Sequence, residues 1–446
     1  MNEEQLLAIS RNLLTTIVSK RTSVQLKYRY YDAEQEVRDL GISMPVKLLM
    51  LNSGLGWASK AVDVIADRIN FDAFENDRLG INALHEIADE TEAVDQAKVD
   101  ARIAGCAFIG IVDDPQTGEQ RYMPFTALEA TGILNTTNGL LKYGLAITRY
   151  NFEAKRADHY NDDSLNYAEN WVLFAEDFTA IFEKRRLVDF IPNRTGRTRL
   201  YLIANEPSTK QPFGRSAISR DARLLIQSGL RTLRRSEVAG EFYSAPQRYL
   251  LNISEEFEKE EGMDLQLGKI ALIEGNDEAG GEVKAGQWTQ QSMTPFSDQL
   301  KMFAQQFCVK SKLTLHQLGF DTENPTSAES YEAMHEDQRV LVEKCQKHFG
   351  RALKRAAIGL RLTASDTSLV TPEMRAINPH FKSIFRIEIG KAGDAVNKVV
   401  QVVPQLKESP QLYYMLGMGV QQAEKYAQEA AQSGSSISTV MTGGEA

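Results

Sequence analysis

Long helices, two of them separated by an acidic segment, limit how this chain can fold more than any other feature of its sequence. Apolar residues recur at helical spacing over Ala217–Phe242, a run that extends about 39 Å at 1.5 Å per residue. A second helix is predicted from Thr294, with Pro295 in its first turn, and a third from Ser327 to about Leu360. These helices are longer than most in globular proteins, so we expect them to form extended rods.

The first long helix has two chemically different faces. Steps of 100° per residue place four other arginines within about 60° of Arg220: Arg223, Arg231, Arg234 and Arg235. The opposite face is apolar: Ile218, Ala222, Leu225, Ile226, Gly229 and Leu233. The basic stripe fits a solvated face of a helix packed on its own domain. It also fits a helix whose second face contacts a neighbouring subunit or a polyanion.

The segment after this helix carries the opposite charge. Ten acidic residues and three lysines lie between Leu251 and Thr294, and Lys269–Ile273 is predicted to form a short strand. A basic stripe beside an acidic module suits repeated contacts between identical subunits, although a solvated surface insertion remains the alternative. On the second helix, Phe296, Leu300, Phe303 and Phe307 form a stripe that is typical of a core.

The rest of the chain predicts an α+β body. Helices are expected at Gln5–Ser19, Val46–Leu51, Ala58–Arg68 and Leu84–Ile103. Alternating apolar residues predict strands at Ala107–Val112, Leu140–Tyr150, Trp171–Phe174, Thr179–Glu183, Leu187–Phe190 and Leu200–Ile203. Residues 362–390 return to sheet and loop, with a strand at Phe385–Ile389. Residues 392–431 are predicted to be helical with breaks at Pro404 and Pro410, and the tail from Ser433 is expected to be disordered.

Signatures of several enzyme classes are missing. Neither Gly-Lys pair, Gly268-Lys269 or Gly390-Lys391, belongs to a phosphate-binding loop, and Gly54–Ser59 lacks the third glycine of a dinucleotide loop. The six histidines and three cysteines show no metal-ligand spacing, which predicts no metal and no cofactor. Asp113 and Asp114 could serve as a catalytic pair, but the Pro and Gly that follow are typical of a hairpin turn.

The net charge and the hydropathy of the chain argue against two further classes of protein. The chain has 51 Lys and Arg against 60 Asp and Glu, a net charge of −9, which argues against a protein that binds nucleic acid over its whole surface. The longest apolar run, Ala104–Val112, is far shorter than the ~18 residues of a membrane span, so no membrane is expected. The cysteine usage and the acidic first residues predict folding in a reducing cytosol without export.

Five groups of residues resemble one protein family, in the same order along the chain. They are Tyr30-Tyr31-Asp32 with Leu40-Gly41-Ile42, Gly56–Asp63, Pro212–Ser216, Glu241–Tyr249, and Leu318-Gly319-Phe320 with Asn324–Glu329. With these residues the chain resembles the portal, or head-to-tail connector, proteins of tailed double-stranded DNA bacteriophages of the siphophage type. The groups span about residues 28 to 350, and the C-terminal region matches only in its helical character.

The resemblance implies a phage portal fold: a mixed α/β wing, long stem helices, a small α/β clip and a helical crown. The wing corresponds to residues 1–214 with 361–390, the stem helices to 215–242 and 295–316, and the clip to 243–294. Residues 317–328 correspond to a loop that projects into the tunnel. Residues 329–360 form a long helix that links to the wing, and 391–446 correspond to the crown and the disordered tail.

A portal also implies partners and a location. Typically twelve copies form a ring at one capsid vertex of the virion, after assembly in the host bacterial cytoplasm. Double-stranded DNA passes through the ring during packaging and ejection, driven by the terminase large subunit. The ring later docks a head-tail adaptor, and it contacts the major capsid and scaffolding proteins. A chain with a net negative charge and no ATPase loop fits a passive channel that does not hold DNA too tightly.

The resemblance and the charge pattern together assign candidate residues. Tunnel-loop residues expected to contact the DNA backbone loosely are Thr322, Glu323, Asn324 and Thr326. Stem residues expected to pair with a neighbour's acids, or to face the channel, are Arg220, Arg223, Arg231 and Arg234. Clip residues expected to dock a basic partner surface are Glu255, Glu256, Glu258, Glu260 and Glu261.

Three other functions remain open on the sequence alone. Another head component, such as a minor capsid or adaptor protein, would share the setting but would not form a large ring with an axial hole. A hydrolase would depend on Asp113 and Asp114. A DNA-binding regulator is disfavoured by the net charge and by the lack of a reader motif.

Overall fold

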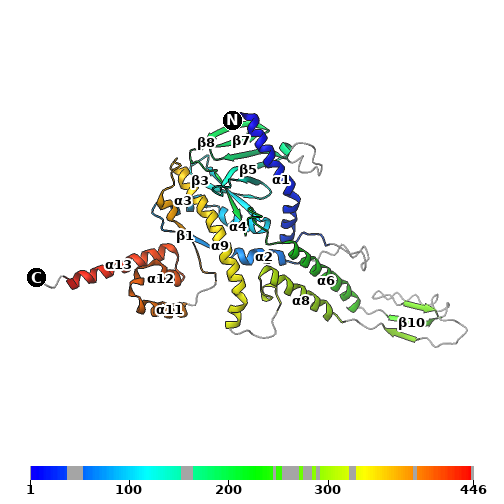
Figure 1. The fold of residues 1–446 in the computed structure, drawn as a ribbon. Helices are drawn as coiled ribbons and strands as arrows, with labels where there is room; N and C mark the ends of the chain where they lie inside the picture. Colours follow the sequence, from blue (N-terminus) through cyan, green and yellow to red (C-terminus); the bar gives the residue numbers. More distant parts are fainter. Residues whose placement is uncertain are drawn as a thin grey trace. The chain divides into compact units, whose positions relative to one another are not determined.

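The computed structural model describes residues 2–37, 54–151, 164–244, 248–253, 271–274, 284–287, 292–320, 328–384 and 389–442. The chain divides into two compact units, each assembled from separate stretches of sequence. The first, here called the body, contains residues 1–32, 59–219 and 326–446; the second, here called the helix-pair unit, contains 33–58 and 220–325. The predicted mixture of helices and strands is confirmed (Figure 1).

Two antiparallel sheets form the upper part of the body. One has the strand order β4-β5-β6-β7-β8 and the other the order β3-β2-β9. The strands are β2 (Cys106–Asp113), β3 (Gln120–Thr126), β4 (Ala130–Leu134), β5 (Leu141–Tyr150), β6 (Ala168–Ala175), β7 (Phe178–Glu183), β8 (Arg186–Pro192) and β9 (Leu200–Ala204). Six of these match the predicted strands. Phe108, Phe174 and Leu200 pack between the two sheets as one apolar cluster.

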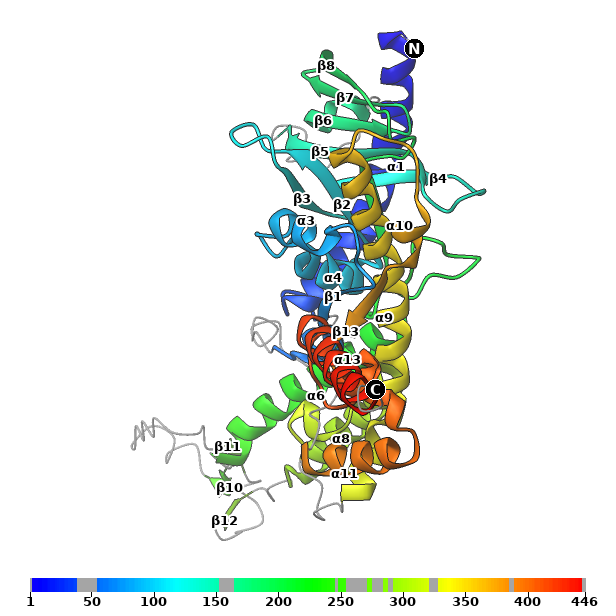
Figure 2. The ribbon, with the colours of Figure 1, turned by 90° about the vertical axis from the view of Figure 1, so that its left-hand side faces the viewer.

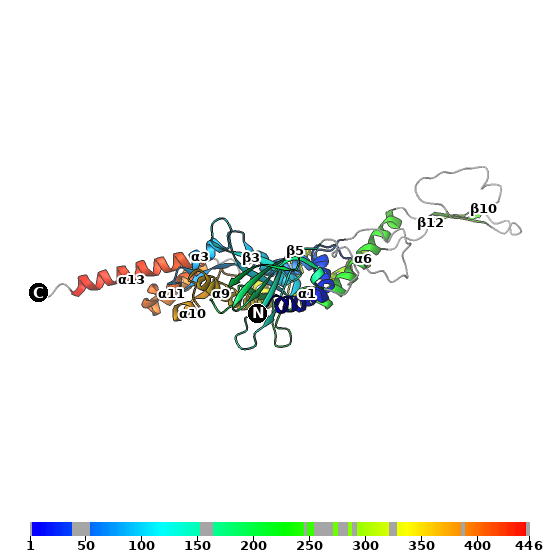
Figure 3. The same ribbon diagram turned by 90° about the horizontal axis from the view of Figure 1, so that it is seen from above.

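Helix α1 (Glu3–Tyr31) covers the five-stranded sheet (Figure 3). A capping box between Asn2 and Gln5 starts the helix, and Leu14 packs in the same cluster as Trp171. The prediction that this helix ends at Ser19 is wrong. The polar turns beyond Ser19 stay helical because tertiary contacts hold them, including the Tyr28 hydroxyl, which donates to Asp100 over 2.7 Å.

Helices build a second core beneath the sheets. They are α2 (Trp57–Ala66), α3 (Ile81–Ala88), α4 (Ala93–Ala104) and α9 (Ala328–Ala364). The predicted helix Leu84–Ile103 is two helices. Glu92 has a φ of 54°, and the Asp89 carboxylate accepts from the backbone N–H of Val94 to cap α4. The third long helix is confirmed as α9, which runs beside the pair β1 (Phe71–Glu75) and β13 (Asn378–Phe381) (Figure 2).

The C-terminal part of the body is helical. It contains α10 (Pro372–Ala376), α11 (Ile389–Val402), η5 (Pro404–Glu408), α12 (Pro410–Met415) and α13 (Val420–Thr442). The breaks predicted at Pro404 and Pro410 are confirmed. The tail expected to be disordered from Ser433 continues α13, because each residue added to an existing helix gains a hydrogen bond. Residues 385–388 of the predicted strand lie outside the described residues, and Ile389 begins α11 instead.

The helix-pair unit contains α6 (Arg220–Ser244) and α8 (Thr294–Ser311). A small sheet of order β11-β10-β12 accompanies them: β10 (Arg248–Ile253), β11 (Ala271–Glu274) and β12 (Lys284–Gln287). Strand β11 overlaps the strand predicted at Lys269–Ile273. Helix α8 ends before the predicted residue 316 because Lys312 adopts a left-handed φ of 57°, and the short η4 (His316–Leu318) follows.

Candidate assembly site: the helix pair and the turn before it

Helices α6 and α8 pack antiparallel within their unit (Figure 1). Two side-chain contacts fix the register. The Lys310 ammonium lies 2.7 Å from the Asp221 carboxylate, and the Thr232 hydroxyl contacts the Gln299 side-chain oxygen at 3.1 Å. The two contacts are equally separated on both helices and run in opposite directions along the chain. The two helices therefore pack side by side as an antiparallel pair.

The core of the pair is small. Ile226, Leu230, Ala304 and Phe307 are fully buried, and the Phe307 ring lies 5.4 Å from the ring of Trp57. The aromatic stripe predicted on α8 is only partly core, since Phe296, Leu300 and Phe303 are half-buried. A helix that buries so little of its apolar stripe within its own unit has surface left for another contact.

The four predicted stem arginines do not form one exposed stripe. Arg220 is exposed, Arg223 and Arg231 are half-buried, and Arg234 is 7% exposed. The same side of α6 is covered near its middle, where the Gln227 side chain donates to the backbone carbonyl of Glu36. The arginine stripe is therefore not uniformly exposed, and the assignment of the four arginines to an inter-subunit or channel-facing role stays a prediction.

Large apolar side chains project from both helices into solvent. Leu224 on α6 is 56% exposed, while Met302 and Val309 on α8 are 43% and 83% exposed. Met302 and Val309 are seven residues apart and so lie on one face of α8. Together with exposed Arg220 and with the Asp221–Lys310 pair, they give the helix pair an outer surface that mixes apolar and charged groups, as protein interfaces do.

The turn immediately before α6 is clamped to the body. The Gly214 φ is 82°, and a Cβ there would lie 2.4 Å from the carbonyl oxygens of both Gly105 and Asn205. Only glycine fits. The backbone N–H of Arg215 donates to the Asn205 carbonyl, and that of Ala217 donates to Arg102. This turn belongs to Pro212–Ser216, one of the five groups that carry the family resemblance, and it fixes the point from which the chain leaves the body.

A buried arginine supports the clamp. Arg102 is 3% exposed, and its guanidinium donates to the carbonyls of Ala61 and Val62 and to the Asn205 side-chain oxygen, 3.3 Å away. Burial lowers the pKa of Arg102. Arg102 was not among the residues predicted from the sequence. The available signal was its place on the buried face of α4, four residues after Lys98 and eight after Val94.

Several predicted residues lie outside the described residues. They are Thr322, Glu323, Asn324 and Thr326 of the tunnel loop and Glu255, Glu256, Glu258, Glu260 and Glu261 of the clip. The assignment of these residues therefore stays a prediction.

The Asp113-Asp114 pair forms the predicted hairpin turn between β2 and β3. The Asp114 carboxylate accepts a hydrogen bond from the backbone N–H of Gln116. This hydrogen bond, and to a smaller extent the contact with Arg121, lowers the pKa of Asp114. Asp113 pairs with Arg199 over 2.7 Å. Each carboxylate thus has its own arginine, and the lowered pKa of Asp114 is the opposite of what a general acid needs.

Neither a metal-ion cluster nor a membrane-spanning helix is found in the described ranges. No group of three or more His, Cys, Asp or Glu side chains there could hold a metal ion. No helix among the same residues combines the length and the apolar character that crossing a membrane requires.

Comparisons with known proteins agree with the resemblance seen in the sequence. The chain is 24% identical to the portal protein of Mycobacterium phage D29 over 373 residues, which cover 78% of this chain and 73% of that protein. It is 24% identical to the portal protein of Mycobacterium phage L5 over 353 residues, 73% of this chain and 68% of that protein. No family model matches the chain.

A solved structure is also similar. A chain from the neck of a native gene transfer agent particle aligns with a TM-score of 0.44 and 10% identity, and the alignment covers 81% of this chain and 89% of that chain. The resemblance of the sequence to phage portal proteins is confirmed by the two mycobacteriophage relatives.

Proposed function

We propose that this chain, which resembles phage portal proteins over about three quarters of its length, forms the portal ring of a tailed bacteriophage. The ring stands at one capsid vertex of the virion. It lets duplex DNA pass during packaging and ejection, and it docks the terminase large subunit and later the head-tail adaptor. Its role is structural rather than enzymatic. The observation that carries the proposal is the similarity to two curated portal proteins along most of both sequences.

The helix pair supports this role. A ring needs each subunit to present two different surfaces that contact its two neighbours. Helices α6 and α8 bury a small core and leave Leu224, Met302 and Val309 exposed beside charged groups. We propose that these side chains become buried between neighbouring copies, and that Arg220, Arg223 and Arg231 pair with acids of the next subunit.

The proposal extends to residues outside the described ranges. Thr322, Glu323, Asn324 and Thr326 would line the passage with polar groups that contact DNA without a strong attraction. The five clip acids from Glu255 to Glu261 would face a basic surface on the terminase or the adaptor. The mature ring would also contact the major capsid and scaffolding proteins, and twelve is the copy number that we expect.

Negative-stain imaging and mass photometry of the purified protein test the ring. Twelve copies of a 49.9 kDa chain give a particle of about 600 kDa, which we expect to show an axial hole. Small assemblies without a hole would favour another head component. Because isolated chains can close with a different copy number, the decisive test is genetic: particles that lack this protein yet fill with genome and join tails would overturn the proposal.

Charge reversal tests the stem assignment. Arg231 is half-buried and donates to the Ser228 hydroxyl, so Arg231→Glu would place a like charge against the neighbour's acids. We expect most of the ring population to be lost, measured by mass photometry. Lys184→Glu is the matched control, since that side chain is 81% exposed on the β7–β8 turn. Rings of normal size from Arg231→Glu would contradict the assignment.

A further inference from the structure

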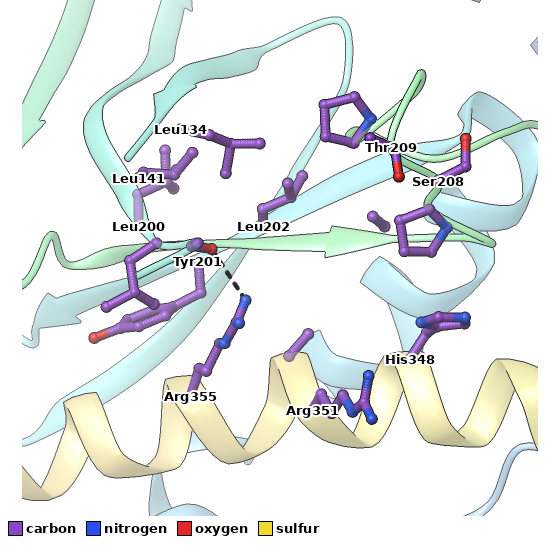
Figure 4. A pocket seen from close by; sticks show the side chains of 16 residues that line it. Leu134, Leu141, Leu200, Tyr201, Leu202, Ser208, Thr209, His348, Arg351 and Arg355 are labelled. Atoms are coloured by element: carbon purple, nitrogen blue, oxygen red, sulfur yellow. Dashed lines mark hydrogen bonds between the residues drawn. The ribbon is translucent and has the colours of Figure 1, made fainter. Parts of the chain in front are cut away.

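A cavity of about 470 Å³ opens in the body between α9 and the sheets (Figure 4). One side of it is strand β9, the β4–β5 hairpin closes one end, and the loop Pro207–Pro212 closes the other. The volume is in the range of sites that hold a few side chains of a ligand. Neither the proposed ring nor the passage of DNA assigns it a role.

The two walls of the cavity differ in chemistry. The sheet side is lined by leucines: Leu134, Leu140, Leu141, Leu200 and Leu202. The α9 side carries His348, Arg351 and Arg355, which are spaced three and four residues apart and so lie on one face of the helix. Leu200 and Leu202 pack with the cluster between the two sheets, whereas Tyr201 packs with α9, so the leucine wall and the cationic wall lie on opposite sides of strand β9.

The cationic wall is held in place. The Arg355 guanidinium donates to the carbonyl of Gly139 over 3.0 Å. Gly139 has a φ of 67°, and a Cβ there would stand 3.3 Å from the Arg355 Nη2, so the glycine lets the hairpin approach the guanidinium. An arginine that is already oriented loses less side-chain entropy when it binds a partner.

The charges of this wall have no counter-ion of their own within the described residues. Over those ranges no carboxylate forms an ion pair with Arg351 or Arg355, and the nearby Glu206 pairs with Lys344 instead. Partial burial, followed by the like charges of Arg351 and Arg197, lowers the pKa of Arg355. Like charges collected beside an apolar wall favour an anionic ligand that also carries apolar groups.

The spacing of the two arginines limits the class of ligand that fits the cavity. Residues four apart on a helix are separated by about 6 Å along its axis. Side chains two apart on an extended peptide are separated by about 6.6 Å and point to the same side, while the residues between them point to the other side. A peptide that alternates acidic and aliphatic residues would therefore set its carboxylates against Arg351 and Arg355 and its aliphatic groups against the leucines.

We infer that this cavity binds an extended segment of a partner protein in which acidic and aliphatic side chains alternate. A nucleic-acid backbone would use the guanidiniums but would leave the leucines without a contact. A helix face that is merely solvated would not need an ordered guanidinium beside a group of leucines. The inference does not rest on ring formation, since every lining residue comes from the body of one chain.

Fluorescence anisotropy with labelled synthetic peptides tests the inference on the full-length protein. The peptide Leu-Glu-Leu-Glu-Leu should bind at least about tenfold more tightly than Leu-Gln-Leu-Gln-Leu, because charge-assisted bidentate contacts are lost in the second. The isomer Leu-Leu-Glu-Glu-Leu has the same charge in the wrong alternation and should also bind more weakly. Equal affinity for all three peptides would overturn the inference.

Variants locate the binding. Arg351→Glu with Arg355→Glu should reduce the affinity for Leu-Glu-Leu-Glu-Leu at least about tenfold, and Leu134→Gln should reduce it through the other wall. Lys347→Glu makes the charge change of one of these two substitutions, on an exposed α9 residue outside the lining, and should have a much smaller effect. Arg355→Lys keeps the positive charge but removes the planar guanidinium. Thermal unfolding of each variant would reveal a folding defect.

Two outcomes contradict the site. A loss of affinity in Lys347→Glu as large as in the double variant would mean that peptide binds a general basic stripe on α9. Displacement of the peptide by a short DNA duplex at a lower concentration than by unlabelled peptide would identify a nucleic-acid surface instead.

Discussion

The body and the helix-pair unit differ in how much apolar core each of them builds. The body buries a whole guanidinium, that of Arg102, and supplies it with backbone and side-chain acceptors. The helix pair has a small core and leaves Val309 83% exposed. Large apolar side chains are exposed in both units, for example Leu369 in the body and Val309 in the helix-pair unit, so the difference between the units lies in the size of the core. A unit with a smaller core has fewer internal contacts to stabilise it.

The largest effect is expected in the body, from Gly214→Val. The new side chain would meet two carbonyl oxygens at 2.4 Å and would force a β-branched residue to a φ of 82°. We expect a loss of about 4 kcal/mol or more in the free energy of unfolding, measured by chemical denaturation. Gly196→Ala is the matched control, since Gly196 has a φ of 66° but open space around it, and it should cost only about 1 kcal/mol. Similar losses in both variants would show that the clamp contributes nothing.

A smaller and local effect is expected in the helix pair, from Phe307→Ala. Removing this fully buried ring leaves a cavity beside Trp57 and should cost about 3 kcal/mol. Hydrogen exchange should speed up at the amides of α6 and α8 while those of β5 and β6 keep their protection. Val309→Ala, two residues away, should leave exchange in the isolated chain unchanged. Faster exchange throughout the body after Phe307→Ala would remove the distinction between the two units.

The pH response should separate the units further. His85 is buried in the body and contacts the Tyr122 hydroxyl at 3.3 Å, and burial lowers its pKa to about 4. Between pH 6.5 and 4 the unfolded chain takes up a proton that folded His85 refuses, so acidification destabilises the body. Relative to His85→Gln, the wild type should lose up to about 3 kcal/mol as the pH falls from 6.5 to 4.

Asp89 is expected to change the stability of the body in the opposite direction over the same pH range. Burial raises the pKa of Asp89 to about 6, so the folded body holds this proton more tightly than the unfolded chain. The stability of the wild type relative to Asp89→Asn should therefore rise as the pH falls from about 6 to 4. Urea unfolding at several pH values measures both differences, and parallel pH curves for the wild type and the two variants would contradict both pKa shifts.

The smallest effect is expected from the exposed ion pair of the helix pair. A hydrogen bond from Lys310 lowers the pKa of Asp221, so its contribution is present above the pKa of a free aspartate and disappears only in stronger acid. Asp221→Asn should change the melting temperature of the isolated chain by no more than about 1 °C, because exposed pairs contribute little. A shift of several degrees, seen by differential scanning fluorimetry, would mean that this pair carries more than a register contact.

The sequence predicts much of the fold correctly because most elements repeat with a clear period. Helices α6, α8 and α9 and six strands of the body show such periods, and all are found near the expected residues. The errors occur where a side chain or the backbone changes course locally. Glu92 splits one predicted helix, Lys312 ends another, and Tyr28 holds α1 together through a polar stretch. None of these three effects follows a repeating pattern in the sequence.

The candidate site was predicted less completely. The arginines of α6 are where the sequence places them along the helix, but the segment around Glu36 covers part of their face, and this contact joins residues far apart in the chain. Arg102 and the walls of the α9 cavity went unnoticed for the same reason. Their partners come from strands, loops and helices that only tertiary folding brings together.

The sequence alone determined the class of the fold, the long helices, the hairpin turn at Asp113-Asp114 and the resemblance to portal proteins, since each depends on neighbouring residues or on a repeating pattern. The tertiary structure decided which charges are buried, which arginines are covered, and that Arg351 and Arg355 line the same cavity as a group of leucines. Burial and charge pairing depend on distances in space between residues far apart in the chain, and no local pattern encodes those distances.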